Sequence, residues 1–176
     1  MNKMREIRIG KVTLNIGVGE SGDKLDKAVS LLKEISGSNP VKTKTMKRIP
    51  TWNIRPKLNI GTKVTLRGKK SEEILKRLFK AVKNKITGKK FDKNGNFSFG
   101  IKEYLNIPGA EYKPEIGIIG LDAAVTLERP GFRVKKRRLK KSKVGQKHRI
   151  TKEEAMEFIK NKFNIEITDK EEEDDY

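Results

Sequence analysis

Several segments of this 176-residue sequence alternate between apolar and polar side chains, and this pattern constrains the fold more than any other feature. Because successive side chains of a strand point to opposite faces, each such segment predicts a β-strand with one buried and one exposed face. A weaker segment, 41–46, is polar on both faces and is expected at a sheet edge. The clearly alternating segments are 11–16, 62–68, 97–101 and 121–128.

Three other segments carry apolar residues at helical spacing. The first covers 25–35, and the second covers 74–86 with Ser71 as its expected N-cap. The third opens at Thr151 with the pattern of a capping box and continues to 163. Three helices with one apolar face each need a surface to cover, and one face of the sheet supplies it.

These patterns together predict an α+β fold, a mostly antiparallel sheet with helices packed on one face and the other face open. The polar positions of two strands would then lie side by side on the open face. Such a surface can hydrogen-bond phosphates, sugars and base edges, although a plain solvated sheet face would show the same pattern. The polar positions concerned are Lys11, Thr13, Asn15, Lys63, Thr65 and Arg67.

The charge is high and unevenly placed. The formal net charge is +19, with 42 Lys and Arg against 23 Asp and Glu, and only 34% of the residues are apolar. Two windows, 35–71 and 129–152, hold no acidic residue, whereas a solvated face mixes both signs. A nucleic acid or an anionic membrane surface is the partner that such a charge favours, and the concentration in two windows favours phosphates along a strand.

Several chemistries lack their residues. The sequence has no cysteine, which excludes disulfides, thiolate metal sites and cysteine nucleophiles. The single histidine, His148, has cationic neighbours and no carboxylate to orient it, so we expect it in contact with nucleic acid or solvent. The longest apolar stretch, 116–121, is too short to span a bilayer. We therefore expect no enzyme activity, no cofactor, no metal, no membrane association and a cytoplasmic location.

Residues 17–22 form a literal G-x-G-x-x-G between a predicted strand and a predicted helix, the context of a dinucleotide-binding turn. However, a strand of that fold is buried on both sides, whereas 11–16 carries polar residues at every second position. The acidic residue expected about 20 positions later is also missing, because that stretch lies in an acid-free window. We therefore predict a tight turn that faces nucleic acid, with Gly17 at its start, and keep a nucleotide cofactor as the alternative.

Two basic loops interrupt the regular pattern. Residues 129–150 have no apolar periodicity, which predicts a long mobile loop that orders on nucleic acid; a nuclear-import signal is the competing interpretation. In 46–60, Trp52 is flanked by cations and either stacks on a base or anchors the loop to the core. The acidic end, 169–176, is expected to be a disordered tail after one domain that covers 1–168.

Several motifs resemble one known family in order and spacing. The chain is similar to the universal large-subunit ribosomal protein five family over nearly its whole length, to about residue 167. The segment 129–131 and the basic loop after it look like the archaeal and eukaryotic branch of that family. The segments that carry the resemblance are 11–20, 35–44, 61–68, 95–101 and 116–122.

The resemblance implies a 5S rRNA-binding protein in the central protuberance of the large ribosomal subunit, present as a monomer. It also implies contact with large-subunit rRNA, with P-site tRNA, with small-subunit head protein thirteen and with neighbouring proteins of the protuberance. Asn15 and Thr65 match the polar residues with which the family recognises 5S rRNA, while Ser38, beside Asn39, stands where the family often has Gln. The loop with Arg48, Trp52 and Arg55 matches the family's tRNA-facing loop. The expected rRNA-binding residues are Lys11, Thr13, Asn15, Gly17, Ser38, Asn39, Lys42, Lys44, Lys63, Thr65, Arg67, Arg133, Lys135, Lys136, Arg137 and Arg138.

Overall fold

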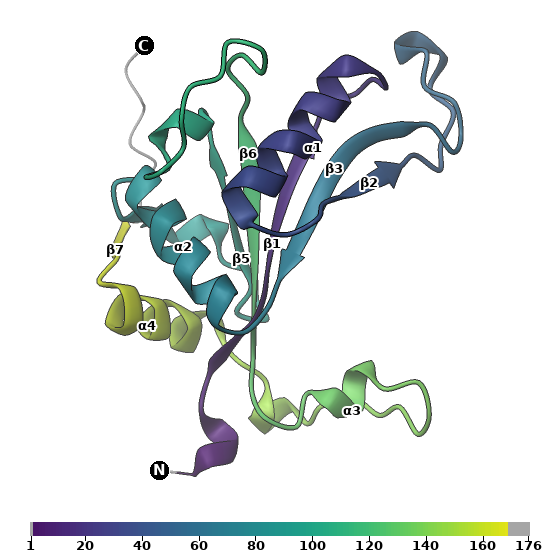
Figure 1. Ribbon diagram of the computed structural model, residues 1–176. Helices are drawn as coiled ribbons and strands as arrows, with labels where there is room; N and C mark the ends of the chain where they lie inside the picture. The colour runs from purple at the N-terminus through teal and green to yellow at the C-terminus, as the bar shows by residue number, and fades with distance from the viewer. Residues whose placement is uncertain (1, 169–176) are drawn as a thin grey trace.

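The computed structural model describes residues 2–168 and is built on a five-stranded antiparallel sheet (Figure 1). The strand order is β2-β3-β1-β6-β5, so the two strands that carry most of the expected polar row, β1 and β3, are central neighbours. The predicted edge strand is indeed at an edge. The bounds are β1 Arg8–Gly17, β2 Val41–Lys44, β3 Asn59–Leu66, β5 Phe97–Ile101 and β6 Leu121–Glu128.

Helices lie on one face of this sheet, with α1 and α2 packed across it and α4 beside α2 (Figure 1). A second, two-stranded sheet pairs β4 with β7 in parallel beyond α2. The observed architecture confirms the α+β class and the single helix-covered face. The remaining bounds are α1 Asp23–Ser36, α2 Lys69–Ala81, α3 Arg133–Lys136, α4 Lys152–Phe163, β4 Lys85–Thr87 and β7 Glu166–Thr168.

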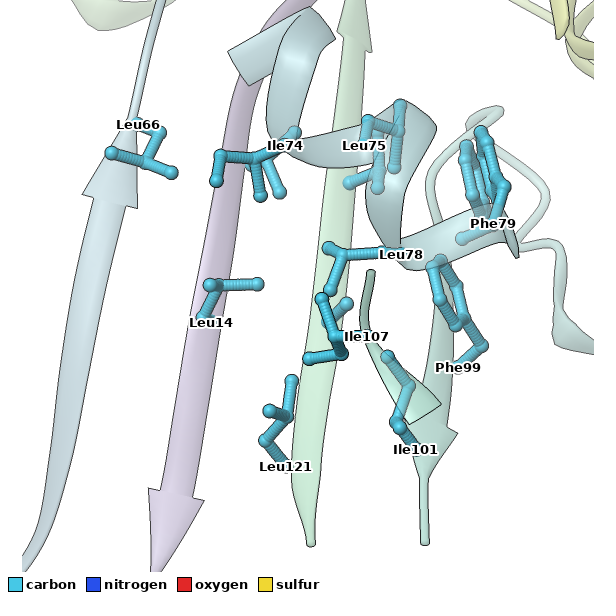
Figure 2. Packing of buried hydrophobic residues seen from close by; sticks show 14 of the residues in the cluster. Leu14, Leu66, Ile74, Leu75, Leu78, Phe79, Phe99, Ile101, Ile107 and Leu121 are labelled. Carbon is cyan, nitrogen blue, oxygen red and sulfur yellow. The ribbon is translucent and has the colours of Figure 1, made fainter. Parts of the chain in front are cut away.

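The core lies between the sheet and the helices, where the apolar positions of both meet (Figure 2). Leu14 and Leu121 point from the strands towards Leu75 and Leu78 of α2, and all four are at most 3% exposed. Phe79 connects this layer to the edge of the sheet, since its ring centroid is 5.5 Å from that of Phe99. The alternation therefore places one side of every long strand in the core and leaves the other side to solvent.

The boundaries of α1 and α4 follow the predicted signals, but those of α2 do not. Thr151 forms both hydrogen bonds of the capping box that opens α4. Ser71, predicted as the N-cap of α2, instead lies buried in its first turn, and its hydroxyl donates to the carbonyl of Gly68. The prediction was wrong because Gly68, at φ +65°, turns the chain and takes the N-cap position, so the helix begins three residues earlier.

The end of α2 also differs from the prediction. The apolar spacing extends to Ile86, yet the helix ends at Ala81 because Lys83 and Asn84 both adopt positive φ values. Ile86 is still 3% exposed, but it reaches the core from β4, paired with Ile167 of β7. A residue at the right helical spacing can therefore be buried from a strand. The acidic tail, 169–176, lies outside the described residues.

Candidate nucleic-acid interface

The side of the five-stranded sheet opposite α1 and α2, called the open face below, carries the polar positions of four strands. Residues directly opposite each other on neighbouring strands point to the same side. One row across the sheet is Lys63, Asn15, Asp122 and Gly100, and the adjacent row is Thr65, Thr13, Ala124 and Ser98. Lys11 lies opposite Thr126 in a third row.

The expected polar residues of β1 and β3 therefore do share one surface. Lys63, Thr65 and Arg67 are exposed, while Asn15, like Thr13 and Lys11, is half-buried between its neighbouring strands. The half-buried side chains are held in place by the sheet, so they lose less conformational entropy when they bind a partner.

Small residues make parts of the open face shallow. Gly17 is exposed, and a side chain added there would meet no atom within 4 Å. Gly100 and Ala124 continue this shallow strip towards the far edge. A partner backbone can approach the main chain closely at such positions.

The sequence patterns missed the contribution of β6 to the open face. Asp122 lies opposite Asn15, and Thr126 lies opposite Lys11, so both belong beside the expected residues. The signal was present in the alternation of 121–128, but only the strand order shows that β6 is the neighbour of β1. Asp122 adds a carboxylate acceptor to the two rows described above, whose other residues are cationic or neutral. Carboxylates accept hydrogen bonds from amino groups of bases.

Lys42 lies on the other side of the sheet. It is opposite Thr62, which is fully buried on the helix side, and its ammonium is 2.5 Å from the carboxylate of Asp26 in α1. Lys44 and Asn39 are exposed, and Ser38 is half-buried in the turn before β2. The open face thus collects the expected residues of β1 and β3, but not Lys42.

The basic loop, defined as residues 129–150, is closed at its base by a buried arginine. Arg129 is 5% exposed, and its guanidinium donates to the Arg149 carbonyl at 3.1 Å and to the Glu154 carboxylate at 2.8 Å. Partial burial raises the pKa of Glu154, whereas the Thr151 amide and the Arg129 guanidinium lower it. The lowering effects together are larger, so the pKa lies below its ordinary value. The two ends of the loop are therefore joined to each other and to α4.

Inside the basic loop the structure is more regular than predicted. Residues 133–136 form the single helical turn α3, which the lack of apolar periodicity did not predict. His148, expected in solvent or on nucleic acid, is half-buried: its Nε2 is 2.8 Å from the Pro130 carbonyl and its ring packs edge-on against Phe132. The short helix and the packing of His148 against Phe132 were not predicted, because they form only when the loop closes. Contact of His148 with nucleic acid stays a prediction.

One acidic residue ties the loop to the end of the sheet. Glu128 accepts from Arg8 of β1 at 3.5 Å and from Lys136 of α3. Lys136 is therefore held against β6 although its side chain is exposed. The other expected cations of the loop, Arg133, Lys135, Arg137 and Arg138, are exposed as well. The backbone of the loop projects from one end of the sheet (Figure 1).

The other basic loop, residues 46–60, projects from the opposite end of the sheet (Figure 1). It is a hairpin extension in which Ile49 and Ile54 exchange backbone hydrogen bonds of 2.9 and 3.0 Å. Ile54 is 5% exposed and Trp52 is 69% exposed. Ile54 therefore anchors the loop, and the alternative in which Trp52 anchors it is excluded. Arg48 and Arg55, in the same loop as Trp52, are also exposed.

The glycine motif is a turn into α1, and not a dinucleotide site. The preceding strand, β1, pairs antiparallel with both β3 and β6, whereas a dinucleotide-binding fold needs parallel neighbours. Gly19 and Gly22 have φ values of +82° and +130°, which favour glycine. The geometry of the turn is therefore sufficient to explain these two glycines. Within residues 2–168 there is no cluster of His, Asp or Glu that could hold a metal ion, and no helix there has the length and hydrophobicity to cross a bilayer.

Comparison with known proteins matches this architecture to one family. Residues 2–55 match the model of ribosomal protein L5, and residues 59–158 match the model of the C-terminus of the same ribosomal family. The chain belongs to the ribosomal protein L5 family. As an L5-family member it is a structural ribosomal protein, and not an enzyme.

Similar L5-family proteins come from archaea, in agreement with the branch that the basic loop indicated. Large ribosomal subunit protein uL5 of Nanoarchaeum equitans is 58% identical over 165 residues, which cover 93% of this chain and 97% of the relative. The uL5 protein of Sulfurisphaera tokodaii is 52% identical, covering 96% of each chain. That of Methanosphaera stadtmanae is 46% identical, covering 95% of this chain and 99% of the relative.

Proposed function

We propose that this L5-family protein binds 5S rRNA with its open face and helps to attach it in the central protuberance of the large ribosomal subunit. The coarser part rests on family membership: relatives of nearly equal length are named as proteins of the large ribosomal subunit, which places this chain there, in the cytoplasm, among rRNA and other ribosomal proteins. The finer part rests on one observation, the polar rows of the open face around Asn15 and Thr65.

The open face suits a folded RNA better than a DNA duplex. Its donors and acceptors are fixed on a rigid sheet, and only some of them are cationic, so it can read shape, 2′-hydroxyls and base edges. The basic loop then contacts large-subunit rRNA, and the loop 46–60, with Arg48, Trp52 and Arg55 exposed, faces P-site tRNA. Small-subunit head protein thirteen and neighbouring proteins of the protuberance complete the proposed partners of a monomer.

Replacing Asn15 and Thr65 together by alanine tests the proposed site. Each lost partner in a buried interface costs about 1 to 3 kcal/mol, so we expect 5S rRNA to bind the double variant at least tenfold more weakly in a filter-binding titration. The matched control is Ser30→Ala with Asn161→Ala, which removes the same chemical groups from exposed positions on α1 and α4. Equal affinity of the double variant and the control would refute the site.

Competition between 5S rRNA and duplex DNA at fixed salt separates this function from general polyanion binding. We expect 5S rRNA to displace the DNA at far lower concentration, because a shape-specific surface gains little from a uniform duplex. If 5S rRNA and duplex DNA compete equally, the protein binds both through charge alone and the proposed recognition of 5S rRNA is wrong.

A further inference from the structure

We propose that the cavity under the basic loop is a preformed pocket for one extruded nucleotide of an RNA strand; this rests on the proposed RNA-binding function. The cavity has a volume of about 670 Å³ and lies between α3, the segment 141–150, the end of β6 and the turn before β5. That volume is within the range of sites that bind small molecules, and it exceeds what a phosphate alone requires.

One side of the cavity is apolar. Phe132 and Val144, both half-buried, line it together with Ile150, which is 2% exposed. The edge-on contact with His148, with 5.7 Å between ring centroids, holds the Phe132 ring in place. Aromatic rings in RNA-binding proteins provide surfaces on which single unstacked bases pack. A phosphate backbone by itself would gain nothing from this apolar side.

The cavity also has several exposed cations in its lining. Lys135, Lys141, Lys143 and Arg149 line it, and all four are exposed. The acidic residue of the lining, Glu128, is already paired with Arg8 and with the remaining lining cation, Lys136. The unbalanced positive charge therefore suits the phosphates that flank an extruded base.

Two amide side chains add hydrogen-bonding groups. Asn94 and Asn96, from the turn before β5, both line the cavity. The Asn94 amide donates to Asp92 at 3.2 Å, which orients it. Amide groups can donate to and accept from base edges, so a stacking ring, amides and phosphate-binding cations meet in one cavity. These are the three kinds of contact that an extruded nucleotide needs.

The test uses the full-length protein and a six-nucleotide single-stranded RNA with a central 2-aminopurine among uridines. We expect its fluorescence to be quenched on binding, because the base stacks on Phe132. A strand with an abasic site at the centre should compete at least tenfold more weakly, and adenosine monophosphate should compete more weakly than the intact strand. If the abasic strand competes equally, or the mononucleotide competes as well as the strand, the proposal is wrong.

Variants assign the effect to the cavity. Phe132→Leu should abolish the quenching and weaken binding at least fivefold without changing the salt dependence, whereas Lys143→Ala should keep the quenching and lower the salt slope by about one. Tyr112→Leu removes an exposed aromatic ring that does not line the cavity, so it is the matched control and should change neither. Quenching that survives Phe132→Leu in folded protein would overturn the proposal.

A second pair of variants avoids the packed ring. Ser142 is exposed and lines the cavity. Ser142→Asp should therefore weaken binding of the RNA strand at least fivefold, whereas the neutral variant Ser142→Asn should bind the strand normally. Equal binding of the two would count against a pocket. The double variant of Asn15 and Thr65 should retain the quenching, so that failure of the pocket and failure of the open face give different results.

Discussion

Gly17 and Gly61 are opposite each other on β1 and β3, but a side chain would meet different surroundings at the two positions. At Gly17 an added Cβ meets nothing within 4 Å. At Gly61 it would lie 2.9 Å from the Ile16 carbonyl and 3.0 Å from the Thr43 hydroxyl. Packing within the protein thus requires a glycine at 61, whereas it does not require one at 17.

We therefore expect Gly17→Val to leave the free energy of unfolding within about 0.5 kcal/mol of the original and to weaken 5S rRNA binding at least tenfold. Gly61→Ala should instead destabilise the fold by about 1 to 3 kcal/mol through overpacking. Urea unfolding and an RNA titration measure the two effects. Normal RNA affinity of Gly17→Val would show that no partner approaches the strand there.

Glu154 predicts a pH dependence of stability. Its pKa is below the ordinary value in the folded state, so its contribution is fully present above about pH 4.5, the reference pKa, and is lost as the pH falls through the folded pKa. Glu154→Gln should lower Tm at pH 7, and the difference from the original protein should shrink towards pH 3. A difference in Tm that is constant from pH 7 to 3 would disprove a role for the ionised carboxylate.

At the scale of elements, the two basic loops are built differently. The basic loop 129–150 is closed at its base by Arg129 and tied to the sheet through Glu128. The loop 46–60 continues the β2–β3 pairing and is anchored by Ile54, which leaves Trp52 exposed at its end. An exposed aromatic ring between cations can stack on a base or ribose without rearrangement of the loop.

Trp52 is the single tryptophan of the chain, so its fluorescence reports on this loop alone. We expect the free protein to emit like tryptophan in water, and tRNA to quench or blue-shift that emission. Trp52→Phe should leave Tm unchanged and weaken tRNA binding less than Trp52→Ala does, because a phenyl ring can still stack. Emission typical of a buried indole in the free protein would contradict the exposed position.

At the scale of the whole molecule, a net charge of +19 acts together with a sheet face that is only partly cationic. The two basic loops project beyond opposite ends of the sheet (Figure 1), and both are rich in Lys and Arg. An RNA that covers the open face therefore extends towards positive charge in both directions. Under the proposed function, we expect the loops to provide most of the electrostatic affinity and the sheet most of the shape recognition.

The affinity for 5S rRNA should consequently fall steeply with salt, with a log–log slope of about 0.7 to 0.9 per neutralised phosphate. Replacing Arg137 and Arg138 of the basic loop by glutamine should reduce by about two the slope measured with large-subunit rRNA. Asn15→Ala should instead lower the affinity for 5S rRNA without changing its slope. The measurement is a set of titrations over a range of potassium chloride concentrations. A slope near zero would show that the charge serves another purpose.

Local patterns in the sequence were sufficient to predict the five strands of the main sheet, the positions of α1 and α4, and the side of each long strand that is buried. They did not predict α3, β4 or β7. Those features depend on neighbours within a few positions: alternation in 11–16 and 97–101, and a capping box at Thr151. The end of α2 was missed because positive φ values at Lys83 and Asn84 leave no mark in apolar spacing.

Only the tertiary structure shows which polar residues lie next to each other. Asp122 joins Asn15 in one row because β6 lies next to β1, and Lys42 turns to Asp26 because α1 covers that side of the edge strand. The Arg129 contacts and the cavity beside Phe132 likewise need segments about 20 residues or more apart to come together. Hydrophobic periodicity specifies the face of each strand, whereas strand order and loop closure depend on packing of the whole chain.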